Sequence, residues 1–404
     1  MVDGFLSKWE LDGDKIPCGP LGVIAMPGCE EMAEKVNKWL KKWNNLQEEE
    51  DQEYYTTPGR GKDTFLMKCY CPRFGTGEGK GVIKESVRGI DIYILVDVTA
   101  HHKTYKMYGV DVPMSPDDYF ADIKRVICAI QGKAKRITVV MPMLYESRQH
   151  RRNGRESLDC AMALQELVHY GVSNIITFDA HDPRVQNAIP TSGFENIMPT
   201  YQMIKALCRS VKDLHIDKEH MMVVSPDEGA MQRNIYYSSV LGLDLGMFYK
   251  RRDFTRVVNG RNPLVAHEYL GDDVEGKDIL VVDDMIASGD SMLDLCKELK
   301  RRKCGRIFAM ATFGFFTAGT GIFDEAYEAG LIDRVITTNA AYHPDEINKA
   351  PWFIQADLSK YIAYIVATLN HDHSLSKLLN PYDKIKNLLT NYKAQQEAEA
   401  AKAE

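Results

Sequence analysis

The 404-residue sequence lacks the patterns that would direct it to a membrane or to a nucleic acid. It has no apolar run of the roughly 18–20 residues that a membrane-spanning helix needs. Its net charge of −7 at pH 7 argues against a nucleic acid as the main partner. The segment Met1–Phe5 lacks the basic and apolar parts of a signal peptide. We therefore expect a cytoplasmic protein with no membrane partner and no nucleic-acid partner.

Metal-binding and nucleotide-binding signatures are also missing. The nine cysteines are odd in number and form no C-x-x-C pair, so we expect reduced thiols. The ATP P-loop, GxxxxGK[ST], occurs nowhere in the chain. The glycine-rich segment Phe74–Gly81 does not match the dinucleotide fingerprint G-x-G-x-x-G. That segment is either a surface loop or a nucleotide-contacting loop in which Phe74 stacks on a base.

Strand-like apolar runs alternate with helix-like segments along most of the chain. The predicted strands are Leu21–Ala25, Ile90–Val96, Arg136–Met141, Asn174–Phe178, Met221–Val224, Ile279–Val282, Arg306–Thr312 and Arg334–Thr338. The predicted helices include Glu30–Trp43, Asp117–Ile130, Leu158–His169, Glu228–Val240 and Met292–Arg301. Several strands are almost continuously apolar, which is typical of parallel strands covered on both faces. The alternation predicts a doubly wound α/β architecture.

The predicted strands are too many for one compact sheet, so we expect two α/β domains. We place an N-terminal domain at 1–198 and a C-terminal domain at 199–370. The acidic segment 46–62 is expected to be an exposed insertion in the first domain. Residues 371–404 are expected to form a C-terminal helix with a flexible tail from Tyr392, because that end is helix-prone but lacks an apolar face.

The most informative motif runs from Ile279 to Ser291. Four apolar residues lead into Asp283 and Asp284, a loop of small residues follows, and a helix-like segment begins at Met292. Backbone N–H groups of such a loop and of the helix N-terminus bind phosphate. The two carboxylates can bind sugar hydroxyls or a metal ion carried by the substrate. The motif predicts a sugar-phosphate site. The structural alternative is a solvated acidic turn without a ligand.

Acids also follow two other predicted strands. Asp179 and His181 come directly after Asn174–Phe178, and Asp227 follows Met221–Val224. The carboxyl ends of strands on one sheet share a crevice, so these groups could hold Mg²⁺ or orient a phosphate. A helix-capping turn is the structural alternative at both positions.

Two basic segments, Arg148–Arg152 and Lys250–Arg252, each follow an apolar run. Guanidinium groups bind phosphate through two hydrogen bonds and keep their charge. The first segment could therefore bind a phosphorylated substrate, and the second could close over phosphates as a loop. Solvated basic turns are the alternative for both.

Taken together and in this order, the motifs resemble the ribose-phosphate diphosphokinase family, also called phosphoribosyl diphosphate synthetases. The resemblance extends from about Gly22 to Pro344 and includes Glu85–Ile94, which is similar to the family segment E-S-V-R-G-x-D-V-Y-I. It implies two tandem type I phosphoribosyltransferase-like domains, each with a mainly parallel sheet flanked by helices. The N-terminal domain would form the ATP side, and the C-terminal domain the ribose-phosphate side.

The resemblance also implies roles for individual residues. The expected ATP-binding residues are Phe74, Thr76, Glu78, Arg148 and Gln149. The expected ribose-5-phosphate-binding residues are Asp283, Asp284, Ala287, Ser288, Gly289, Asp290 and Ser291. His181 and Asp227 are the expected Mg²⁺ ligands, and Lys250 and Arg252 the expected catalytic residues. The implied reaction converts ATP and ribose 5-phosphate to AMP and 5-phosphoribosyl 1-diphosphate, for nucleotide biosynthesis, in a homo-oligomer that is a dimer or a hexamer.

Some positions depart from the family pattern. Thr76 replaces the usual acid or amide, Ala287 the usual aspartate, Asp290 a small residue, and His150 the aspartate after Arg148-Gln149. Three alternatives therefore stay open: a phosphoribosyltransferase, which the Asp283–Ser291 loop alone fits equally well, a non-catalytic regulatory relative, and an enzyme with another 5-substituted ribose as acceptor.

Overall fold

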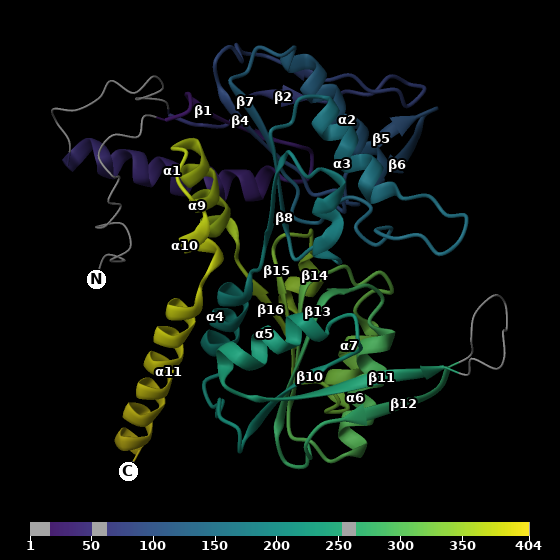
Figure 1. The fold of residues 1–404 in the computed structure, drawn as a ribbon, viewed down its shortest axis with the longest axis vertical. Helices are drawn as coiled ribbons and strands as arrows, with labels where there is room; N and C mark the ends of the chain where they lie inside the picture. The colour runs from purple at the N-terminus through teal and green to yellow at the C-terminus, as the bar shows by residue number, and fades with distance from the viewer. Residues whose placement is uncertain (1–16, 51–62, 253–263, 404) are drawn as a thin grey trace. The chain divides into compact units, whose positions relative to one another are not determined.

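The computed structural model describes residues 17–50, 63–252 and 264–403 (Figure 1). The chain forms two compact units. The first comprises Met1–Ile197 with Ser359–Leu379, and the second Met198–Leu358 with Asn380–Glu404. Each unit contains one main sheet flanked by helices, which confirms the predicted fold class.

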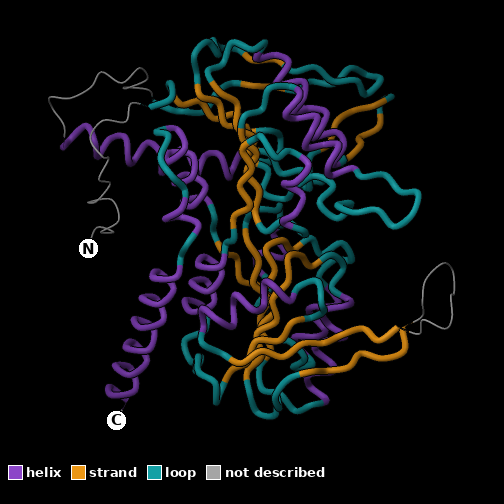
Figure 2. The backbone as a smooth tube through the Cα atoms, viewed as in Figure 1, coloured by secondary structure: helices purple, strands orange, loops and turns teal. Residues whose placement is uncertain are grey.

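The first unit is built on a five-stranded parallel sheet with the order β1-β4-β7-β8-β9. Figure 2 draws the strands of the described chain in orange and the helices in purple. Its strands are β1 (Leu21–Ala25), β4 (Asp91–Leu95), β7 (Arg136–Val140), β8 (Asn174–Phe178) and β9 (Gly193–Ile197). Two small antiparallel ribbons accompany it, formed by β2 (Cys69–Tyr70) with β3 (Val82–Ile83) and by β5 (Thr104–Met107) with β6 (Val110–Pro113). Its helical elements are α1 (Glu30–Glu50), α2 (Pro116–Ile130), α3 (Asp159–His169), η1 (Pro183–Ala188), α9 (Ser359–Asn370) and α10 (Ser376–Leu379).

The second unit has a seven-stranded sheet with the order β12-β11-β10-β13-β14-β15-β16, in which only the β11–β12 pair is antiparallel. Its strands are β10 (Met221–Ser225), β11 (Asp244–Arg252), β12 (Leu264–Leu270), β13 (Asp278–Ile286), β14 (Ile307–Gly314), β15 (Arg334–Thr338) and β16 (Phe353–Ala356). Its helices are α4 (Thr200–Ser210), α5 (Met231–Leu241), α6 (Asp290–Arg301), α7 (Gly321–Glu328), α8 (Asp345–Lys349) and α11 (Tyr382–Ala403).

The sequence of strand β13 is continuously apolar over Ile279–Val282 because both of its faces are buried. Ile279 and Val281 pack in one core with residues of α6, α7 and α8. Leu280 and Val282, on the opposite face, pack with residues of α4, α5 and α11. Because side chains alternate between the faces of a strand, a strand covered on both sides has no polar face.

The expected division at residue 370 differs from the compact units. Helix α9 belongs to the first unit, where Trp43 of α1 and Tyr364 of α9 stack with ring centroids 4.4 Å apart. The chain therefore returns to the first unit after Leu358 and to the second unit at Asn380. Burial of α9 against α1, a contact distant in sequence, decides this division.

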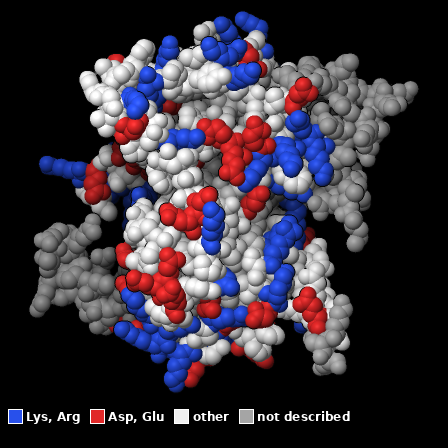
Figure 3. Space-filling view, turned by 180° about the vertical axis from the view of Figure 1, so that it is seen from behind, with Lys and Arg blue, Asp and Glu red and all other residues white. Residues whose placement is uncertain are grey.

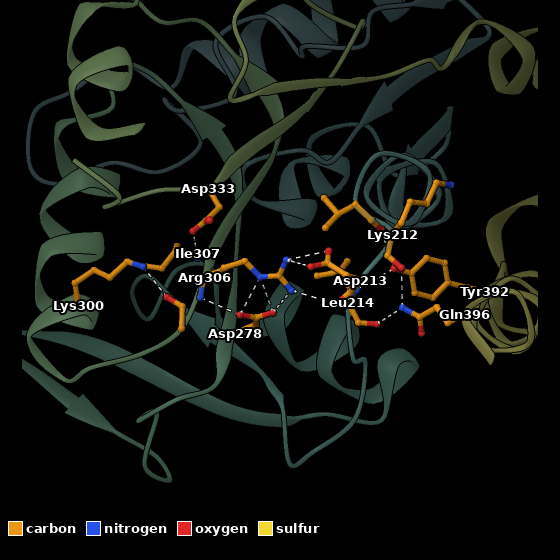
Figure 4. A network of polar contacts seen from close by, with 12 residues as sticks. Lys212, Asp213, Leu214, Asp278, Lys300, Arg306, Ile307, Asp333, Tyr392 and Gln396 are labelled. Carbon is orange, nitrogen blue, oxygen red and sulfur yellow. Dashed lines mark hydrogen bonds and ion pairs between the residues drawn. The ribbon is translucent and has the colours of Figure 1, made fainter. Parts of the chain in front are cut away.

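The expected tail from Tyr392 lies within a helix whose first part is packed on the second unit. Helix α11 continues to Ala403, and the Tyr392 side chain is only 7 % exposed (Figure 4). Tyr392 Oη donates to the carbonyl of Val211 at 2.7 Å and accepts from the Leu214 N–H at 3.1 Å. Gln396 Nε2 donates to the carbonyls of Lys212 and Leu214, each at 2.9 Å. These hydrogen bonds act together with apolar packing, because Ile385 is fully buried and Leu388 and Leu389 pack against the same core.

The expected insertion 46–62 is only partly described: α1 runs on to Glu50, and residues 51–62 lie outside the described chain. On the face shown in Figure 3, Lys and Arg side chains are interspersed with Asp and Glu over the described residues. Within those residues, no helix is both long and apolar enough to cross a membrane.

Candidate active site

The predicted sugar-phosphate loop connects β13 to α6 at the carboxyl end of the sheet. Gly289 is the N-cap of α6, and no side chain within the described chain caps that helix end. The first N–H groups of a helix have no partner inside the helix, so this end can bind an anion. Ser288 Oγ donates to Asp290 Oδ2 at 2.8 Å. Asp290 itself is exposed.

Gly289 is required at its position. Its φ of +103° is one that residues with a side chain rarely adopt, and a Cβ there would lie 2.4 Å from two atoms of the Phe323 ring. The loop therefore rests directly on an aromatic ring of α7. This close approach is what the small residues in the motif allow.

A cavity of about 220 Å³ lies over this loop. It is lined by Pro226, Asp227, Asp283, Met285, Ile286, Ala287, Ser288, Gly289, Ser291, Met292 and Leu295. The structure thus brings together the predicted residues Asp227, Asp283, Ala287, Ser288, Gly289 and Ser291 from the ends of β10 and β13. Asp284 and Asp290 are not among the lining residues, and Asp284 is buried.

The two acids of β13 differ because strand side chains alternate. Asp283 faces the cavity and also accepts a hydrogen bond from the Asp284 N–H at 2.9 Å. Burial, together with the negative charge of Asp284, raises the pKa of Asp283 above its usual range. Arg233 of α5 opposes this shift, with Nη1 3.8 Å from Asp283 Oδ1. The site thus holds a carboxyl group that a cation or a hydroxyl donor would stabilise.

Two residues of α5 were missed by the sequence reasoning. Asn234 is fully buried, and its Nδ2 donates to Val282 O and Ala230 O at 2.8 Å each and to Ser225 Oγ at 3.2 Å. It therefore joins the ends of β10 and β13, which carry Asp227 and Asp283. The other residue is Arg233. It could have been singled out from the sequence, because it is the only charged residue of α5.

The cavity suits a magnesium ion that arrives with a substrate. Mg²⁺ keeps several waters and is usually held by one or two carboxylates plus phosphate oxygens. Asp227 and Asp283 provide two carboxylates on one cavity, although Asp227 Oδ1 also accepts from the Ala230 N–H at 3.1 Å. No group of three or more His, Cys, Asp or Glu among the described residues forms a ready-made metal cage. The donor set fits Mg²⁺ bound with substrate.

The predicted ATP loop between β2 and β3 is a tight turn. The Phe74 N–H donates to the Glu78 carbonyl at 2.7 Å, and Thr76 Oγ1 donates to Glu78 Oε2 at 2.8 Å. The Phe74 ring is 54 % exposed and lies 5.8 Å from Lys80 Nζ. An exposed aromatic face of this kind can stack on a base.

The structure brings the basic loop after β7 next to the turn after β8. His150 Nε2 lies 3.4 Å from Asp182 Oδ2, and the rings of His150 and His181 have centroids 5.4 Å apart. Arg148 is exposed, whereas Gln149 Nε2 donates to the Ser157 carbonyl at 2.8 Å and so helps to shape the loop. Hydrogen bonds from Arg184 lower the pKa of Asp182 to about 2.

The remaining predicted residues stay predictions. Lys250 and Arg252 end β11, which pairs with β12, but their side chains lie outside the described residues. His181 belongs to the first unit and Asp227 to the second, so their pairing around one ion is a proposal.

Comparison with known proteins agrees with this geometry. Residues 21–171 match the N-terminal domain of ribose phosphate pyrophosphokinase, and residues 191–321 match the phosphoribosyl transferase domain. The ribose-phosphate pyrophosphokinase of Vibrio vulnificus strain YJ016 is 28% identical over 313 residues, which cover 76% of this chain and 90% of that protein. That of Mycoplasma genitalium is 28% identical over 285 residues, covering 69% and 80%.

A solved structure gives the same fold. The phosphoribosylpyrophosphate synthetase of Mycobacterium smegmatis aligns with a TM-score of 0.67 at 22% sequence identity, covering 87% of this chain and 98% of that one. Two tandem phosphoribosyltransferase-type domains, with the loop site in the second, define the class of protein. Within that class, the chain belongs to the ribose-phosphate pyrophosphokinase family.

Proposed function

We propose that the protein is a ribose-phosphate diphosphokinase. It transfers the diphosphoryl group of ATP to the 1-hydroxyl of ribose 5-phosphate, and 5-phosphoribosyl 1-diphosphate and AMP are released. The observation that carries the proposal is the cavity that joins Asp227, Asp283 and the Ala287–Gly289 loop, in a chain whose first unit matches the pyrophosphokinase N-terminal domain.

The acceptor would bind in this cavity. Its 5-phosphate would accept hydrogen bonds from the backbone N–H groups of Ser288–Ser291, where the N-terminus of α6 favours negative charge. Asp283 would accept hydrogen bonds from the ribose hydroxyls, with Asp284 buried behind it. The 1-hydroxyl then attacks the β-phosphorus of ATP, and AMP leaves in line. Positioning and charge stabilisation dominate such a transfer.

The donor would be held by residues of the first unit. Phe74, Thr76 and Glu78 would contact ATP from one loop, and Arg148 from another, with Gln149 holding that second loop in shape or contacting ATP itself. Lys250 and Arg252 would stabilise the charge on the transferring group. Mg²⁺, when bound near Asp227 and His181, would neutralise phosphate charge. A cytoplasmic homo-oligomer, a dimer or a hexamer, completes the proposal.

Two rivals predict different chemistry. A phosphoribosyltransferase would consume 5-phosphoribosyl 1-diphosphate, but it would leave the ATP loops of the first unit and Lys250–Arg252 without a role. A non-catalytic relative is favoured by Ala287 and Thr76, and it would bind substrates without turnover.

The full-length protein should be incubated with ATP, Mg²⁺ and ribose 5-phosphate, with AMP release and product mass measured. We expect AMP and 5-phosphoribosyl 1-diphosphate in equal amounts, and no AMP when ribose 5-phosphate is omitted. Diphosphate release from 5-phosphoribosyl 1-diphosphate and a nucleobase, without AMP formation from ATP, would establish the transferase instead. AMP formed only with a different 5-substituted ribose would change the acceptor but keep the reaction.

A further inference from the structure

A buried histidine lies at the strand ends next to the sugar-phosphate loop, and the proposed mechanism gives it no role. His343 follows β15 and is 6 % exposed. Its Nε2 lies 3.0 Å from the carbonyl oxygen of Gly314 at the end of β14, and its Nδ1 lies 3.3 Å from the amide Nε2 of Gln355 in β16. The ring therefore bridges the strands on both sides of β15.

Gly314 and Gln355 assign the proton on this ring, and the Thr337 hydroxyl, with Oγ1 3.3 Å from Nε2, can accept from the same N–H. The Gly314 carbonyl can only accept, so Nε2 carries the hydrogen and donates it. The Gln355 amide nitrogen donates, so Nδ1 is bare and accepts. Burial lowers the pKa of His343 to about 4, which agrees with a neutral imidazole. His343 is thus a neutral side chain with one donor and one acceptor, both used.

The strand end that His343 holds is attached to the sugar-phosphate loop. The Phe315 N–H donates to the Ile286 carbonyl at 2.8 Å, and the Thr317 N–H donates to the Ala287 carbonyl at 2.9 Å. Between them, Phe316 adopts a φ of +47°, a left-handed conformation that costs energy for a residue with a side chain. Surrounding contacts must therefore maintain the 314–317 segment in this form.

Aromatic packing provides a second connection to the loop. The Phe316 ring packs against His343, with centroids 6.0 Å apart, and against Phe323 in a T-shaped pair at 5.2 Å. Phe323 is the ring on which Gly289 rests. The Phe316 ring thus contacts both Phe323 and His343, and His343 also hydrogen-bonds to Gly314, two residues before Phe316.

We propose that His343 is a positioning residue for ribose 5-phosphate: by holding Gly314, it keeps Phe316 and the Ala287–Gly289 loop in the form that receives the 5-phosphate. The proposal rests on the proposed function and assigns His343 no contact with substrate. Asn or Gln can replace a neutral histidine of this kind only where both hydrogen bonds can be rebuilt, which the longer glutamine side chain permits.

The test compares His343→Leu, His343→Gln and Tyr392→Phe with the wild type. Tyr392→Phe is the matched control, because it removes buried hydrogen bonds to Val211 and Leu214 in the same unit. Asp213, between those two residues, binds Arg306 just before β14, so the control lies at the amino ends of the strands (Figure 4). Binding of ribose 5-phosphate is measured by calorimetry, and kcat and KM for each substrate by AMP release. Thermal unfolding of each variant is recorded as well.

Loss of one buried hydrogen-bonding group that holds a binding loop corresponds to about a tenfold change in the Kd of the ligand. We expect His343→Leu to raise the Kd and KM for ribose 5-phosphate about tenfold, with the KM for ATP unchanged. His343→Gln should restore most of that loss, and Tyr392→Phe should leave both constants at the wild-type value even where its melting temperature falls.

The inference is overturned if His343→Leu binds ribose 5-phosphate as the wild type does, or if Tyr392→Phe weakens binding equally. A parallel rise in the KM for ATP would also overturn it. Failure of the proposed function is a separate result: the wild type would then release no AMP, while calorimetry would still decide whether His343 controls ribose 5-phosphate binding. Absence of any ribose 5-phosphate binding by the wild type would reject both.

Discussion

The guanidinium of Arg136 binds both carboxylate oxygens of Asp91, with Nε 2.8 Å from Oδ1 and Nη2 2.7 Å from Oδ2. Asp91 is fully buried and also accepts from Asn370 Nδ2 at 2.9 Å, while Arg136 Nη2 donates to the Leu369 carbonyl at 2.7 Å. This ion pair joins the starts of β4 and β7 to the end of α9. The second unit has a similar ion pair between Arg306, which immediately precedes β14, and Asp278, the first residue of β13 (Figure 4).

Arg136→Met should destabilise the protein strongly. The substitution leaves the Asp91 charge buried without its partner, which typically costs about 3–5 kcal/mol of unfolding free energy. Denaturant unfolding measures this change. Lys106→Met is the control, because its pair with Asp111 is exposed and contributes about 1 kcal/mol or less. Equal losses of unfolding free energy in the two variants would show that the buried Asp91–Arg136 pair contributes no more stability than an exposed pair.

Asp283 should make the ligand-free protein less stable as the pH rises. Its pKa is raised on folding, so above the ordinary aspartate pKa of about 4 the folded chain keeps a proton that the unfolded chain releases. The unfolded state then binds fewer protons, and the unfolding free energy falls with increasing pH. Asp283→Asn should remove this slope in melting temperatures recorded between about pH 5 and about pH 8. Asp294→Asn, at an exposed site on α6, should leave the slope unchanged.

Lys250→Ala should abolish most turnover without unfolding the protein. By analogy with other phosphoryl transfers, removal of a cation that stabilises the transferring group lowers kcat on the order of 10³-fold. AMP release and circular dichroism together measure this outcome. Lys218→Ala is the control, because Lys218 pairs with Asp244 at the opposite end of β11. Near-normal turnover in Lys250→Ala would reject the catalytic role of this segment.

Tyr392→Ala should destabilise the second unit, because it removes a buried aromatic ring and both of its hydrogen bonds. Truncation of a buried aromatic residue to alanine costs about 3–5 kcal/mol. Tyr382→Ala on the same helix, where the side chain is 51 % exposed, should cost far less. Thermal or denaturant unfolding distinguishes the two variants. A Tyr392→Ala protein as stable as Tyr382→Ala would mean that α11 does not hold the unit together.

The motif from Ile279 to Ser291 could be read from the chain because its determinants are local. A continuous apolar strand, an acid pair and small residues before a helix are all defined by neighbours in sequence. The strands and most helices follow from the same kind of pattern. The cavity that joins Asp227 to Asp283 was also foreseeable in outline, because parallel strands place their carboxyl ends together.

The directions of the Asp283 and Asp284 side chains could not be predicted from the sequence. Both acids carry the same charge, and only the pleat of β13 sends Asp283 into the cavity and Asp284 into the interior. Asn234 and Arg233 lie more than 40 residues before the motif, and their roles depend on how α5 packs over β10 and β13.

The sequence by itself therefore determined the α/β class, the tandem domains and the small-residue loop between β13 and α6, because periodicity and strand–loop–helix patterns act over a few residues. Tertiary structure alone decided that α9 returns to the first unit, that Tyr392 is buried, and that His343 supports the Gly314 segment beside the loop. These depend on contacts between residues far apart in the chain, whose stability comes from burial that no local pattern records.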